Sequence, residues 1–198
     1  MAYTEDWFSH NIANWLVWLG PLSHRPHLNF LEVGAFEGMA SGWLMRNIVT
    51  ASTSTLTCCD TWSGPIQAYG GTGEDVEVRF DENVKAFGDR VRKRKGRSER
   101  VLSQMIAAGE RFDGAYVDAD HYGPEVLRDG ILAFSLLTPG GVLIFDDYLW
   151  RQPLVSVFPG EAIDAFLSVF RDEVDLIGKG YQVAVRKRAG RGGRCSPP

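Results

Sequence analysis

The sequence has few cysteines and no long apolar segment. Its three cysteines are Cys58, Cys59 and Cys195, which give neither a disulfide framework nor the spacing of zinc ligands. No apolar run is long enough to span a membrane, and the N-terminus shows no basic region followed by an apolar stretch, as a signal peptide would. We therefore expect a cytoplasmic protein without a membrane partner, because unpaired cysteines suit a reducing compartment.

A strong net charge is also lacking. The chain carries 21 lysines and arginines against 25 aspartates and glutamates, a net charge of −4, which argues against nucleic acid as the main partner. The 198 residues are expected to form one domain, residues 1–198. Within it we expect residues 1–24 to form an N-terminal cap helix and residues 188–198 to form a flexible basic tail.

Strand-like and helix-like segments alternate along the chain. Apolar and β-branched stretches predict seven strands, at residues 29–35, 55–62, 91–95, 112–119, 142–145, 174–177 and 181–186. Helices are predicted between them, at residues 39–49, 74–87, 98–108, 124–137 and 161–170. This alternation is typical of an α/β protein whose mainly parallel sheet has helices on both faces. The short turn at residues 178–180 makes the last two strands an antiparallel hairpin.

A glycine turn follows the first predicted strand. Its pattern is E-x-G-x-x-x-G, from Glu32 through Gly34 to Gly38, with a second acid at Glu37. This differs from the G-x-G-x-x-G turn that binds a pyrophosphate. Carboxylates beside such a turn repel phosphate and favour a cationic ligand with hydroxyl groups. S-adenosylmethionine fits this description, because it carries a sulfonium, an ammonium and a ribose diol but no phosphate.

Acidic side chains recur where the predicted strands end. They are Glu32, Asp60, Asp118, Asp120, Asp146 and Asp147. Parallel α/β sheets bind ligands at the carboxyl ends of their strands, and an acid at the end of the second strand commonly binds a ribose diol. Each acid alone is better explained as a helix cap or turn residue. The set as a whole favours a ligand site at one edge of the sheet.

Three segments of the second half carry a family resemblance. They are FDGAYVDADH at residues 112–121, LRD at residues 127–129 and LTPGGVLIFDDY at residues 137–148. Together with the glycine turn, they resemble class I S-adenosylmethionine-dependent methyltransferases. The resemblance extends over residues 29–186 and is greatest to methyltransferase family 24, near the catechol- and caffeoyl-CoA-type O-methyltransferases. It implies a Rossmann-like class I fold.

The resemblance also implies a set of cofactor contacts. The methionine and ribose moieties would be surrounded by the first loop, with Glu32, Gly34, Ala35, Phe36, Gly38 and Ser41. The ribose hydroxyls would bind Asp60, and the adenine would lie near Thr61, Trp62 and Ser98. Asp118, at the end of the fourth strand, would lie beside the methyl donor.

The resemblance raises a metal site as well. Catechol-type relatives bind a divalent cation through an acid after the fourth strand and an Asp-Asn pair after the fifth. Asp118 matches the acid, and Asp146 with Asp147 matches the pair, although this chain has Asp where Asn is usual. Oxygen ligands of this kind suit Mg²⁺, Mn²⁺ or Ca²⁺. Alternatively, one of the two aspartates turns outward and caps the next loop.

His121 is the candidate for acid–base chemistry, beside Asp118. A neutral imidazole at the mouth of the site could accept the proton of a substrate hydroxyl during methyl transfer. The alternative is a histidine with a structural hydrogen bond at the start of a helix. The resemblance therefore predicts O-methylation of a small-molecule hydroxyl, with or without a divalent cation, by a monomer or a homodimer. Other interpretations are a non-catalytic or hydroxylase-like relative and an NAD-dependent oxidoreductase.

Overall fold

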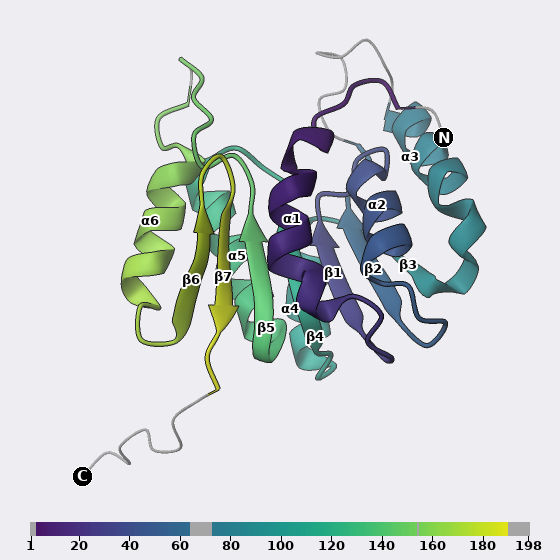
Figure 1. The fold of residues 1–198 in the computed structure, drawn as a ribbon. Helices are drawn as coiled ribbons and strands as arrows, with labels where there is room; N and C mark the ends of the chain where they lie inside the picture. Colours follow the sequence, from purple (N-terminus) through teal and green to yellow (C-terminus); the bar gives the residue numbers. More distant parts are fainter. Residues whose placement is uncertain (1–2, 64–72, 154, 190–198) are drawn as a thin grey trace.

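The computed structural model describes residues 3–63, 73–153 and 155–189. Within them, seven strands form one sheet in the order β3-β2-β1-β4-β5-β7-β6 (Figure 1). The strands are β1 (Asn29–Val33), β2 (Thr55–Asp60), β3 (Val91–Lys95), β4 (Phe112–Val117), β5 (Leu137–Phe145), β6 (Val174–Lys179) and β7 (Val183–Lys187). β7 is antiparallel to β5 and β6, and the other neighbours are parallel. The predicted fold class is confirmed, including its C-terminal hairpin.

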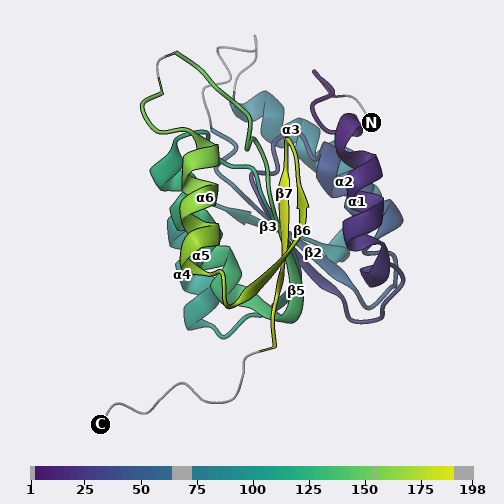
Figure 2. The ribbon, with the colours of Figure 1, turned by 60° about the vertical axis from the view of Figure 1, so that its left-hand side comes forward.

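Helices cover both faces of the sheet, as Figure 2 shows. One face carries α1 (Ile12–Leu19), α2 (Met39–Asn47) and α3 (Gly73–Val84), and the other carries α4 (Ser98–Ala107), α5 (Gly123–Leu136) and α6 (Pro159–Val169). Short 3-10 helices lie at η1 (Ser9–Asn11), η2 (Gly20–Leu22) and η4 (Lys85–Arg90). None of the helices formed by the described residues is both long enough and apolar enough to cross a bilayer.

The alternation of side chains along β1 explains the two apolar layers. Phe30 packs with Leu44 and Trp15 on the face covered by α1 and α2. Leu31, the next residue, packs with Leu102 in the cluster on the opposite face. Successive strand residues point to opposite faces, so a strand with helices on both sides is apolar throughout.

The register of the parallel strands aligns the residues of the site. Val33 of β1 is paired with Cys59 of β2 and with Val117 of β4, and Val117 is paired with Phe145 of β5. The residues that follow Val33, Cys59, Val117 and Phe145 are, in the same order, Gly34, Asp60, Asp118 and Asp146. They therefore lie in one row along the carboxyl edge of the sheet, as expected for parallel strands.

The N-terminal helical region begins later than the spacing of its apolar residues indicates. The Asp6 carboxylate accepts hydrogen bonds from the backbone N–H of Ser9 at 2.8 Å and of Phe8 at 3.2 Å, so that helical structure starts at Ser9. α1 then lies against the sheet, with Trp15 fully buried. At the other end, Arg188 pairs with Asp175 at 2.7 Å. The remainder of the predicted tail, from residue 190, lies outside the described residues.

Candidate functional site

The turn after β1 requires glycine at Gly34. Its φ is +89°, and a Cβ at this position would lie 2.1 Å from the backbone oxygen of Asp118. The loops after β1 and β4 therefore touch through backbone atoms, which a side chain would separate. Gly38 has a φ of +80° and precedes the first residue of α2. The two glycines set the path of the loop between strand and helix.

Glu32 lies beneath this loop and not in an open cavity. It is 1% exposed, accepts a hydrogen bond from the Ser41 hydroxyl, and lies 3.3 Å from the Cys58 thiol. Burial raises the pKa of Glu32 to about 8, more than these hydrogen bonds lower it. Its other carboxylate oxygen, Oε1, has no partner within the described residues. Glu32 and Ser41 thus link β1 to α2 from behind the predicted cofactor loop.

Glu37 faces the N-terminal strap, defined here as residues 3–8. Its buried carboxylate accepts hydrogen bonds from the backbone N–H of Thr4 at 2.7 Å and from the Thr4 hydroxyl, and pairs with Arg79 at 2.6 Å. Burial raises the pKa of Glu37, but the bonds from Thr4 and Arg79 lower it by more, so that the net pKa is below its usual value. The strap also stacks the Trp7 indole on Phe36. Glu37 therefore joins the strap to the loop.

Asp60 accepts three backbone hydrogen bonds at the end of β2. Its Oδ2 accepts the N–H groups of Ala35 and Phe36, both at 2.8 Å, and its Oδ1 accepts that of Trp62 at 2.7 Å. A carboxylate offers about four acceptor positions. One position therefore stays open on Asp60. The two loop amides that would bind a phosphate in a dinucleotide site are already bonded to this carboxylate.

A cavity of about 440 Å³ opens beside this row of strand ends. Its walls include four of the predicted cofactor residues, namely Gly34, Asp60, Thr61 and Ser98. The walls also include Arg97, Glu99 and Arg128, to which sequence reasoning gave no role in binding, and the cavity reaches Ala119 and Asp120. Trp62 does not line it, because the indole is buried against Phe80 and donates to the backbone oxygen of Phe36 at 3.0 Å.

Asp118 and Asp146 share a tyrosine beneath the carboxyl edge. The Tyr116 hydroxyl lies 2.8 Å from Asp118 Oδ2 and also contacts Asp146 Oδ2. A phenol has one hydrogen to donate, so the second contact needs a proton on one carboxyl group. Burial and the neighbouring aspartates raise the pKa of Asp118 well above its usual range, and burial also raises that of Asp146. Gln182 donates to Asp146 at 2.9 Å and completes its surroundings.

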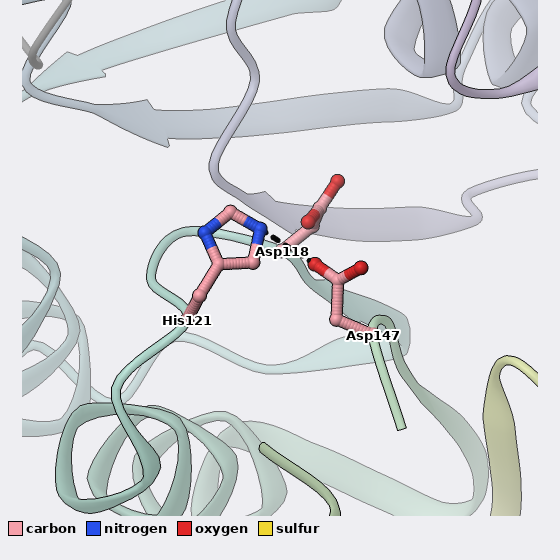
Figure 3. A group of neighbouring side chains, drawn as sticks. All are labelled: Asp118, His121 and Asp147. Carbon is pink, nitrogen blue, oxygen red and sulfur yellow. Dashed lines mark ion pairs between the residues drawn. The ribbon is translucent and has the colours of Figure 1, made fainter. Parts of the chain in front are cut away.

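His121 and Asp147 face each other above Asp118, which is half-buried, and the buried Asp146. His121 Nε2 lies 2.7 Å from Asp147 Oδ2, along the dashed line in Figure 3. Burial lowers the pKa of His121, but the hydrogen bond and charge of Asp147 outweigh it, and the net pKa is raised. The imidazole stacks on Trp150, with 4.7 Å between ring centres. The arrangement is a histidine whose protonated form is stabilised by a carboxylate.

The metal-ligand set that the structure brings together differs in one member from the predicted set. Ligand atoms of Asp118, His121 and Asp147 all lie within 4.8 Å of one another (Figure 3). Asp146 does not join them, because its oxygens are bonded to Tyr116, Gln182 and the backbone N–H of Asp147. Two carboxylates and an imidazole fit a divalent transition metal better than Mg²⁺ or Ca²⁺.

Sequence reasoning also gave no role to three further polar residues of the site, Tyr116, Tyr181 and Gln182. Tyr181 donates to Asp147 Oδ1 at 2.7 Å. The contact follows from the antiparallel pairing of β7 with β5, in which Val183 is paired with Phe145. Residues just before Val183 must therefore lie beside Asp146 and Asp147. The predicted hairpin paired only the last two strands with each other and so did not indicate this contact.

Comparisons with known proteins identify the family and the fold. A family model described as a methyltransferase domain, methyltransferase family 24, matches residues 31–148, more than half of the chain. A search of curated proteins found no match. The fold is similar to an O-methyltransferase from Bacillus cereus in complex with S-adenosylhomocysteine, with a TM-score of 0.61 and 21% identity over 80% of this chain and 74% of that chain.

A second similar structure is the O-methyltransferase TomG from Streptomyces achromogenes, which is involved in tomaymycin synthesis and was solved with S-adenosylmethionine. The TM-score is 0.62, with 18% identity over 81% of this chain and 73% of that chain. At these identities the likeness shows a shared fold. The family match covers the glycine turn and both acidic segments, from Leu31 to Tyr148. The chain therefore belongs to methyltransferase family 24, and it has the class I fold expected of an S-adenosylmethionine-dependent methyltransferase.

Proposed function

We propose that the protein transfers the methyl group of S-adenosylmethionine to a hydroxyl oxygen of a small molecule. One observation carries the proposal: the cavity that contains Gly34 and Asp60 reaches Ala119 and Asp120, directly before His121 and its partner Asp147. A cofactor pocket and a basic group thus adjoin at neighbouring strand ends. The structures of Bacillus cereus and Streptomyces achromogenes described above, both O-methyltransferases, support the choice of oxygen.

The Asp60 carboxylate in the wall of the cavity favours this cofactor over a dinucleotide. The open acceptor position of Asp60 can take one ribose hydroxyl. Thr61 and Ser98 would flank the adenine, and Gly34 would allow close approach to the backbone. A pyrophosphate would meet the Asp60 carboxylate and find the amides of Ala35 and Phe36 already bonded.

His121 would act as the general base, and Asp118 would lie beside the methyl donor. The acceptor oxygen attacks the methyl carbon, the carbon–sulfur bond breaks, and the hydroxyl proton moves to His121. The Asp147 carboxylate, 2.7 Å from Nε2, stabilises the imidazolium that forms. Alignment of oxygen, methyl and sulfur supplies the rest of the rate acceleration, because orientation alone can lower a barrier by about 7–11 kcal/mol.

A metal-bound form is the second candidate, favoured by the close approach of three ligand groups. Asp118, His121 and Asp147 would hold the ion, which would lower the pKa of the acceptor hydroxyl. The ring nitrogen of His121 that binds the ion could not then also accept the hydroxyl proton. We expect kcat to be unchanged after treatment with EDTA and dialysis, as measured by transfer of radiolabelled methyl groups. Loss of activity that Mn²⁺ or Mg²⁺ restores would assign His121 to the metal instead.

Calorimetric titration tests the cofactor. We expect S-adenosylmethionine and S-adenosylhomocysteine to bind and NAD to release no heat, because the loop amides are bonded to Asp60. Binding of NAD alone would overturn the proposal. A screen for methyl release over phenols and sugars then tests the acceptor class, and cofactor binding without turnover on any of them would favour the non-catalytic interpretation.

A further inference from the structure

The turn between β6 and β7 contacts both aspartates that follow β5. Tyr181 donates its hydroxyl hydrogen to Asp147 Oδ1 at 2.7 Å, and Gln182 donates its amide to Asp146 Oδ2 at 2.9 Å. Two consecutive residues of one turn thus bind two consecutive acids of another. Gln182 holds its aspartate toward the buried Tyr116, whereas Tyr181 binds the aspartate that faces His121.

Asp147 has little freedom in this arrangement. Its φ is +59°, a left-handed backbone conformation, and its N–H donates to Asp146 Oδ1 at 2.7 Å. Of its two carboxylate oxygens, Oδ1 accepts from Tyr181 and Oδ2 faces His121. A carboxylate with a partner on only one oxygen can rotate about its terminal torsion, which is a broad, soft degree of freedom. The Tyr181 bond removes that rotation.

We infer that Tyr181 is a positioning residue for methyl transfer: its hydroxyl orients the Asp147 carboxylate so that Oδ2 faces the base His121. This inference rests on the proposed role of His121. Tyr181 acts through Asp147. Because the tyrosine hydroxyl is the donor, Asp147 stays an ionised acceptor that can stabilise a protonated His121. A phenol is protonated at neutral pH, so the Tyr181 hydroxyl carries the hydrogen that it donates to Asp147.

The position of the Tyr181 ring does not depend on its hydroxyl. The backbone N–H of Tyr148 donates to the Tyr181 carbonyl at 2.8 Å, and the next residue, Gln182, is buried and bonded on both ends of its amide. The ring edge also lies against His10, with 6.0 Å between centres. Tyr181→Phe therefore removes one hydrogen bond and leaves the turn in place.

Steady-state kinetics of Tyr181→Phe test the inference. We expect kcat to fall about tenfold while the KM for S-adenosylmethionine stays unchanged, because loss of a bond to a charged group weakens orientation and not cofactor binding. The matched control is Tyr148→Phe, which removes a tyrosine–carboxylate bond of 3.0 Å to Asp164 at the surface. The control should retain the wild-type kcat.

A double-mutant cycle separates positioning from a general structural effect. In an Asp147→Ala background, Tyr181→Phe should produce no further fall in kcat, because its partner is gone. An equal fall in both backgrounds, or a wild-type kcat for Tyr181→Phe, overturns the inference. If His121→Ala keeps the wild-type kcat, the proposed base itself is excluded. If His121→Ala is inactive and Tyr181→Phe is not, the proposed function stands and the inference fails.

Discussion

Replacement of His121 by alanine should lower kcat by about 10²- to 10⁴-fold, the usual contribution of a general base. The side chain is 46% exposed, and its Nε2 faces Asp147 at 2.7 Å. No histidine other than His121 contacts Asp147 among the described residues. The affinity for S-adenosylmethionine should not change, because His121 does not line the cavity itself. Calorimetry and methyl-transfer kinetics on the same preparation measure the two effects.

The pH dependence of this reaction follows from the raised pKa of His121. A general base must be neutral, so kcat should rise with pH through the pKa of His121, which Asp147 places above the ordinary histidine value. Asp147→Asn removes the charge and should move this limb to lower pH. His24→Ala is the control and should leave kcat unaltered, since His24 lies at the surface and bonds Thr50 at 3.0 Å. An unchanged turnover in His121→Ala would exclude the histidine as base.

Replacement of Gly34 by alanine should both destabilise the fold and abolish cofactor binding. The backbone has a φ of +89°, and the added Cβ would lie 2.1 Å from the oxygen and 2.7 Å from the next Cα of the loop after β4. Backbone strain and overpacking together should lower the free energy of unfolding by about 2–5 kcal/mol. Denaturant unfolding followed by tryptophan fluorescence, with calorimetry of S-adenosylmethionine binding, measures both losses.

Gly109→Ala is the matched control for Gly34→Ala. Gly109 also has a positive φ, +73°, but a Cβ there meets nothing within 4 Å. Gly109→Ala should therefore lower the free energy of unfolding by the backbone strain alone, about 1 kcal/mol, and leave cofactor binding unchanged. Equal destabilisation by the two substitutions would show that the contact with Asp118 is not what makes glycine necessary at Gly34.

The sequence predicts the place of the site better than the roles of its acids. Parallel pairing necessarily puts the ends of β1, β2, β4 and β5 in register, so the row from Asp60 to Asp146 could be expected from the strand pattern alone. The direction in which each carboxylate points could not be expected from that pattern. Glu37 turns toward Thr4 because Arg79, which is distant in the sequence, supplies a charge there.

The aspartate pair illustrates the same limit. Asp146 and Asp147 are chemically identical neighbours, and nothing local distinguishes them. Their different surroundings come from Tyr116 of β4 and from Tyr181 and Gln182 of the turn between β6 and β7. His121 was identified as a candidate from its place after β4, but its pairing with Asp147 depends on the left-handed φ of +59° at that residue. Such a backbone conformation at a non-glycine residue has no reliable signal in a single sequence.

The hydrogen bond between the Trp15 indole and the Gln182 amide oxygen has a consequence for the order of folding. It is 2.7 Å long, buried, and joins residues 167 positions apart. Because a chain is synthesised from its N-terminus, α1 leaves the ribosome without this partner and must wait until β7 is made. Contacts of such large sequence separation slow folding, since the loop must close before they form. Gln182, directly before the final strand, therefore completes at once the packing of the first helix and the surroundings of Asp146.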